Sequence, residues 1–106
     1  MGTFSAQIVD LALQIPAGRV TTYGHLARAA GGGGQAARSV TGILSKYPNH
    51  AAIPFHRIVY AGGRVWWNDE YKAKRQKLFK KEGIEVNDKG YIKDFEELLF
   101  DFSEVY

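Results

Sequence analysis

The sequence contains no cysteine among its 106 residues. This absence excludes disulfide bonds, thiolate metal ligands and a cysteine nucleophile, and it favours a reducing, intracellular environment. No apolar run approaches the roughly 20 residues that a membrane-spanning helix needs. The N-terminal segment is interrupted by Asp10 and has no basic region, which argues against a signal peptide. We therefore expect an intracellular protein that does not contact a membrane.

Proline is scarce, and apart from four consecutive glycines at 31–34 there is no linker, repeat or low-complexity segment. Hydrophobic residues make up 45% of the chain. That content suffices for a modest core in a chain of this length. We predict a single domain over residues 1–106.

Charge is distributed unevenly along the chain. The formal net charge is +3, but residues 93–106 contain five acidic residues and one lysine, a net of −4, which leaves +7 on residues 1–92. A basic body favours a polyanionic partner such as nucleic acid, although many proteins with other partners have a similar charge. The acidic end could contact a partner protein or shield the basic body, and the sequence does not decide between the two.

Hydrophobic spacing predicts a mainly helical fold with small β elements. Apolar residues recur at helical spacing over residues 3–15, 22–30, 35–47 and 68–83, whereas 19–22, 58–60 and both sides of the "NDKG" turn at 87–90 are β-prone. The helices at 22–30, with Thr22 as N-cap, and at 35–47 are separated by the glycine run. This order outlines a helix-turn-helix, so we expect a winged-helix-like domain.

The outward face of the second of these helices begins with small residues. Ala36 and Ala37 would let the helix approach a DNA groove closely, and Arg38 follows them. By itself, Arg38 could equally be a solvated surface arginine, and Tyr23 a half-buried residue at a helix start. The basic residues of the helix at 68–83 lie all around it rather than on one stripe, and we interpret them as a solvated face.

The histidines show no spacing typical of a metal site, and we expect neither a metal nor a cofactor. His56, in "PFHR", would need a nucleophile or water and an orienting partner to act as a general base. Its neighbour Phe55 has no transferable proton and no nucleophilic lone pair. The Phe55 ring therefore belongs either to the core or to the wall of a pocket for a flat group.

Four stretches occur in a fixed order: "VTTYGHLA", "AARSVTGIL", "IPFHRIV" with a following glycine turn, and "KEG". Over residues 4–86 they resemble the C-terminal DNA-binding domain of the O6-alkylguanine-DNA alkyltransferases. In particular, the chain is similar to the alkyltransferase-like proteins, which lack the acceptor cysteine. The enzymes carry Pro-Cys-His-Arg where this chain has Pro-Phe-His-Arg at 54–57. Phe55 replaces the thiolate, so the resemblance implies that this protein is not an enzyme.

The resemblance implies a DNA damage recognition protein. It would bind O6-alkylguanine in duplex DNA through the minor groove and rotate the damaged nucleotide into an apolar pocket, at a cost of roughly a few kcal/mol. It would bend the duplex and mark the lesion for nucleotide-excision repair proteins, acting as a monomer in the cytoplasm or nucleoid of a prokaryote or the nucleus of a eukaryote. Two alternatives stay open: a winged helix-turn-helix transcriptional regulator, and a base-excising enzyme of the same fold.

The resemblance also assigns residues. Tyr23 matches a tyrosine that crowds the phosphate of the rotated nucleotide, and Arg38 matches an arginine that fills the vacancy in the base stack. Other residues matched to the DNA-binding face are Ser5, Ala36, Ala37, Thr41 and Gly42. The lesion pocket is expected to be bordered by Tyr23, Phe55, Val65, Trp66, Trp67 and Asn68. The former active-site network, with only a structural role in the absence of a thiol, consists of His56, Arg57 and Glu82.

Overall fold

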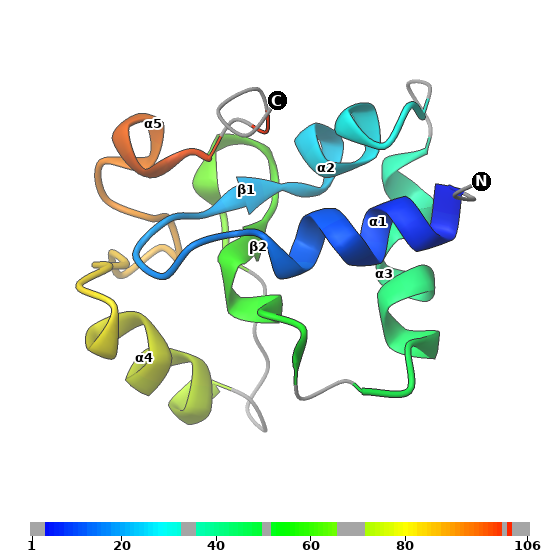
Figure 1. Cartoon of the computed structure of the whole chain (residues 1–106). Coiled ribbons are helices and arrows are strands. Elements are labelled where there is room, and N and C mark those ends of the chain that lie inside the picture. The colour runs from blue at the N-terminus through cyan, green and yellow to red at the C-terminus, as the bar shows by residue number, and fades with distance from the viewer. Residues whose placement is uncertain (1–3, 33–35, 50–51, 66–71, 101, 103–106) are drawn as a thin grey trace.

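The computed structural model of the protein describes residues 4–32, 36–49, 52–65, 72–100 and 102. A short parallel sheet, formed by β1 (Thr21–Thr22) and β2 (Ile58–Val59), lies at the centre. Helices α1 (Phe4–Leu13), α2 (Tyr23–Ala29) and α3 (Ala37–Lys46) pack together on one side, and α4 (Lys72–Lys81) and α5 (Phe95–Leu98) lie on the other (Figure 1). The predicted mainly helical fold with small β elements is confirmed.

The sheet separates two hydrophobic clusters because successive side chains of a strand point to opposite faces. Thr21 pairs with Ile58 and Thr22 with Val59. Ile58 enters a cluster formed mainly by α1, α2 and α3, which we call the helical core, whereas Val59 enters a second cluster that contains Phe79 of α4. A two-residue strand therefore joins both halves of the hydrophobic interior.

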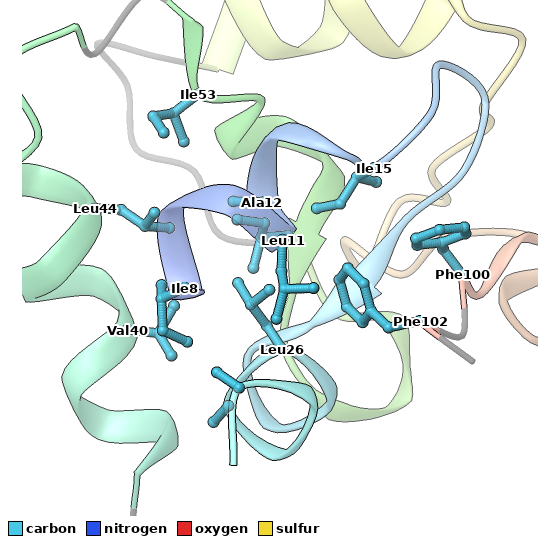
Figure 2. Close-up of a cluster of buried hydrophobic side chains, with 13 residues drawn as sticks. Ile8, Leu11, Ala12, Ile15, Leu26, Val40, Leu44, Ile53, Phe100 and Phe102 are labelled. Atoms are coloured by element: carbon cyan, nitrogen blue, oxygen red, sulfur yellow. The ribbon is translucent and has the colours of Figure 1, made fainter. Parts of the chain in front are cut away.

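The helical core is built from the predicted apolar positions of the first three helices. Figure 2 shows Ile8 and Leu11 of α1 lying close to Val40 of α3 and Leu26 of α2, all of them buried. Ile15 is also buried, although α1 ends at Leu13. The helical periodicity thus identified the core face correctly.

The turn between α2 and α3 needs a residue without a side chain at Gly32. The Thr22 hydroxyl first caps α2 by accepting a hydrogen bond from the His25 backbone N–H at 3.0 Å, as predicted. Past the helix end, the Gly32 N–H donates to the Ala27 carbonyl, and a Cβ at this position would lie 2.5 Å from the Ala36 Cβ. Glycine therefore allows α3 to begin close beside α2.

The segment that leads into the glycine turn contains less strand than its apolar residues indicate. Phe55–Arg57 form a 3-10 turn, η2, in which the Arg57 N–H donates to the Pro54 carbonyl, and only Ile58–Val59 are extended. A second short turn, η3, covers Ala61–Gly63. β1 ends at Thr22 because α2 begins at Tyr23, so β2 has only two residues to pair with.

The C-terminal segment adds a further parallel pairing to the sheet. Val20 donates to the Leu98 carbonyl, and its own carbonyl accepts from the Phe100 N–H. The side chains of Phe100 and Phe102 then enter the helical core (Figure 2). Near the "NDKG" turn, Val86 and Ile92 form an antiparallel bridge, so the β-prone segments on the two sides of the turn make a small hairpin. Within the described segments, no helix has the length and apolar character needed to cross a bilayer.

Candidate functional site

The outer face of α3 carries several of the residues predicted to bind DNA. Val40 and Leu44 point into the helical core, so the opposite side of α3 presents Arg38, Thr41 and Gly42 to solvent. Ala36 and Ala37 are half-buried at the helix start, and Ser5 is exposed on α1. The face is therefore open, lined by small residues, and carries the large cationic side chain of Arg38.

Tyr23, the first residue of α2, connects this face to the sheet. The Thr41 side chain lies near its hydroxyl and opposes the rise of its pKa, and its ring centroid lies 5.5 Å from that of Tyr60, which follows β2. Burial raises the pKa of Tyr23, and the neighbouring Tyr60 adds to the effect. The hydroxyl therefore keeps its proton at neutral pH and can act as a hydrogen-bond donor as well as an acceptor.

Phe55 stands at the start of η2 and is half-buried, with its ring against the helical core. Tyr23 packs against the same core and is also half-buried. Both aromatic residues thus have one part on the apolar interior and another part accessible to solvent. This position fits the wall of a cavity and also fits a residue at the edge of the core.

Val65, another of the predicted pocket residues, is 5% exposed and packs within the second cluster together with Val59 and Phe79. Its side chain contributes to the interior there. The other three predicted pocket residues lie outside the described residues: Trp66, Trp67 and Asn68. A hollow of about 530 Å³ lies between α4 and residues 83–88, and its described lining includes none of Tyr23, Phe55 and Val65.

Glu82 lies at the centre of the network predicted from the Pro-Phe-His-Arg motif. Its carboxylate accepts hydrogen bonds from Arg57 Nη2 at 2.8 Å and Arg57 Nε at 3.0 and 3.2 Å, and His56 Nε2 lies 2.6 Å from its Oε2. Arg57 Nη1 reaches the Ile15 carbonyl at 2.9 Å, and the Gly18 N–H donates to Glu82 at 3.0 Å. The network therefore ties α4 to η2 and to the loop after α1.

The protonation states in this network follow from its contacts. Burial alone would raise the pKa of Glu82, but hydrogen bonds from Arg57, Gly18 and His56 outweigh it and lower the pKa to about 2. Burial lowers the pKa of His56, although the hydrogen bond and charge of Glu82 oppose this shift. At neutral pH the carboxylate is ionised and the imidazole is neutral, with its Nε2–H directed at Glu82.

Two members of the site were not found by sequence reasoning. Gly18 belongs to a loop 64 residues before Glu82, and no local pattern indicated their contact. Arg75 was grouped with the solvated bases of α4, yet its charge acts on both Tyr23 and His56. The other bases of α4 are exposed, as predicted: Lys72, Lys74, Lys77, Lys80 and Lys81. Arg75 is half-buried, and this difference follows from the packing of α4 against η2.

Comparison with known proteins gives consistent results. Residues 3–84 match the family described as 6-O-methylguanine DNA methyltransferase, DNA binding domain. The chain is 32% identical over 90 residues to a DNA base-flipping protein of Escherichia coli, covering 85% of this chain and 69% of that protein. It is 31% identical over 88 residues to alkyltransferase-like protein 1 of Schizosaccharomyces pombe, covering 81% of each.

The fold is also similar to a solved structure. The crystal structure of S. pombe Atl1 in complex with damaged DNA containing O6-carboxymethylguanine superposes with a TM-score of 0.74 at 25% identity, covering 95% of this chain and 99% of that one. The match extends past residue 84 and so includes the C-terminal segment that pairs with Val20. The family predicted from the four sequence stretches is confirmed. The chain belongs to the family of the 6-O-methylguanine DNA methyltransferase DNA-binding domain.

Proposed function

We propose that this protein is a non-enzymatic sensor of O6-alkylguanine in duplex DNA. It binds through the minor groove with α3, rotates the damaged nucleotide out of the helix, and holds the base against an apolar wall formed by Phe55. The bound complex marks the lesion for nucleotide-excision repair. The repair coupling is supported by the family resemblance alone, whereas the DNA contact is supported by the exposed face of α3 and the apolar wall by the half-buried ring of Phe55.

The observation that carries the proposal is the half-buried ring of Phe55 beside an intact His56–Glu82 pair. An alkyl transfer needs a nucleophile at this position, and a phenyl ring supplies none. The chain also has no cysteine at any other position. A ring with one exposed side can still contact an alkyl group and a flat base through dispersion and apolar burial. Recognition then persists, because no reaction consumes the lesion.

The geometry of α3 supports the extrusion step. Arg38 is exposed on the outer face of the helix, where its planar guanidinium can stack and donate hydrogen bonds at the same time. The protonated hydroxyl of Tyr23, close to Thr41, can donate to a phosphate of the rotated nucleotide. Small residues at the start of α3 let its backbone approach the DNA closely, and the minor groove, about 6 Å wide in B-DNA, has to widen to receive a helix.

The His56–Arg57–Glu82 network then has a supporting role. It joins η2, which carries Phe55, to α4 and to the loop at Gly18 through hydrogen bonds of 2.6 to 3.2 Å. A fixed η2 keeps the Phe55 ring in place against the core. We infer that these residues position the recognition surface rather than take part in chemistry.

The test is a binding titration with two short duplexes that differ only in one O6-methyl group on guanine. The parent protein should bind the modified duplex at least tenfold more tightly and leave both the methyl group and the glycosidic bond intact, as checked by mass spectrometry. Equal affinity for both duplexes would overturn the proposal and favour a sequence-reading regulator. Loss of the methyl group would indicate a transferase, and release of the base a glycosylase.

Four variants and one control test the DNA-binding residues assigned to α2 and α3. Arg38→Ala and Arg38→Lys should both reduce the preference for the modified duplex, because lysine keeps the charge but cannot stack as a plane. Tyr23→Phe, which removes only the hydroxyl, should weaken binding less than Tyr23→Ala. Lys80→Gln, on exposed α4, is the control that should bind like the parent. Full lesion preference in both alanine variants would show that the assigned residues do not extrude the base.

A further inference from the structure

The surface next to Tyr23 contains an aromatic and basic group that the proposed function does not use. Tyr60 is 40% exposed, its ring lies 5.5 Å from that of Tyr23, and the Arg64 guanidinium carbon lies 5.6 Å from the Tyr60 centroid on its face. Through these contacts, Tyr60 and Arg64 extend the predicted DNA-binding face of α3 beyond Tyr23. We call the two added residues the Tyr60–Arg64 pair.

The backbone holds this pair in a fixed arrangement. Tyr60 N–H donates to the Arg64 carbonyl at 2.8 Å across η3, where Gly62 and Gly63 have φ of 80° and 90°. A Cβ at Gly63 would lie 2.8 Å from the ring of Phe95, so this turn needs glycine. The side chains of residues 60 and 64 are thus brought together by a turn whose backbone conformation requires glycine.

The hairpin fixes Arg64 from the other side. Arg64 forms an antiparallel bridge with Tyr91, and its neighbour Val65 donates to the Gly90 carbonyl at 2.7 Å. Residues directly opposite in an antiparallel pair project from the same face, so Arg64 and Tyr91 share a face. Tyr91 is 42% exposed. Arg64 therefore stands between two exposed tyrosines.

We propose that the Tyr60–Arg64 pair is a phosphate clamp for the DNA backbone beside the extruded nucleotide, an inference that rests on the proposed function. An arginine guanidinium binds phosphate oxygens in a bidentate manner, and the aromatic face beneath it restricts its orientation before binding. Arg64 is exposed and lies on the same surface as Tyr23 and Thr41. The charge of Arg75, which acts on Tyr23, makes this surface more favourable for a phosphodiester.

The clamp differs from the lesion pocket in what it recognises. A phosphate contact adds affinity for any duplex and carries no information on the base. It also makes binding more dependent on salt, because each neutralised phosphate releases condensed counterions. The Tyr60–Arg64 pair should therefore change overall affinity and salt dependence, while the ratio of affinities for modified and unmodified DNA stays constant.

The experiment measures dissociation constants for the modified and unmodified duplexes at several salt concentrations between 50 and 200 mM. Arg64→Gln should weaken binding to both duplexes by a similar factor, roughly 5- to 10-fold near 0.1 M salt, and reduce the slope of log K against log salt by about 0.9. Tyr60→Phe, which keeps the ring under the guanidinium, should bind within about twofold of the parent. Lys80→Gln removes one positive charge away from the pair and should leave the slope unchanged.

The outcomes separate this inference from the proposed function. An unchanged slope in Arg64→Gln, with thermal unfolding like that of the parent, would overturn the clamp. A loss of lesion preference in Arg64→Gln would overturn it as well, because that residue would then read the base. If the parent itself shows no lesion preference, the proposed function fails, while a reduced slope in Arg64→Gln still supports a phosphate contact at this position.

Discussion

Replacing Glu82 with glutamine should destabilise the protein in a manner that depends on pH. In the folded state the carboxylate accepts hydrogen bonds from Arg57 and Gly18 and contacts His56, and its side chain is 8% exposed. These contacts hold its pKa at about 2, against an ordinary value of 4.5. A depression of this size corresponds to about 3 kcal/mol of folding free energy at neutral pH.

The sign follows from the direction of the pKa shift. Because the folded pKa lies below the unfolded one, the stabilisation is fully present above about pH 4.5 and is lost as pH falls toward about 2. Glutamine carries no charge at any pH, so the variant should lack this part of the pH dependence. At neutral pH the variant should lose about 2 to 3 kcal/mol, since the Arg57 charge would lose its partner.

The assay is urea unfolding of parent and Glu82→Gln between pH 7 and pH 2.5. The difference in free energy of unfolding between the two should shrink steadily below pH 4.5. Glu85→Gln is the matched control, because Glu85 meets Lys93 at 3.4 Å with both side chains mostly exposed. The control should change stability by less than about 0.5 kcal/mol. A difference for Glu82→Gln that stays constant from pH 7 to pH 2.5 would refute the reasoning.

Two further predictions concern stability and use the same unfolding assay. Thr22→Ala should cost about 1 kcal/mol by removing the N-cap of α2, whereas Thr22→Ser should recover most of it, because the serine hydroxyl can still accept from the His25 N–H; equal losses in both variants would count against the cap. Phe100→Ala should cost about 3 to 5 kcal/mol, because the ring is 3% exposed in the helical core and contacts Phe102 edge to face. Leu13→Ala, at an exposed site of α1, is its control, and a comparable loss there would mean that burial of Phe100 is not the cause.

Local features of the sequence determined much of the fold and the position of the site. Helical spacing identified the inward faces of α1, α2 and α3, and a threonine before Tyr23 identified the cap of α2. These features act over three or four residues, so the sequence alone reveals them. The ordered motif with Pro-Phe-His-Arg likewise identified the family, because side-chain identities at fixed spacing do not depend on tertiary contacts.

The tertiary structure decided which distant residues meet. The C-terminal segment pairs with Val20 from almost 80 residues away, and the Gly18 amide completes the contacts of Glu82. Packing of α4 against η2 separates Arg75 from the other bases of its helix. The bridge from Arg64 to Tyr91 likewise joins two segments that sequence patterns treat separately. Such contacts depend on chain topology and on the competition among many compact arrangements, and no pattern within a short window contains that information.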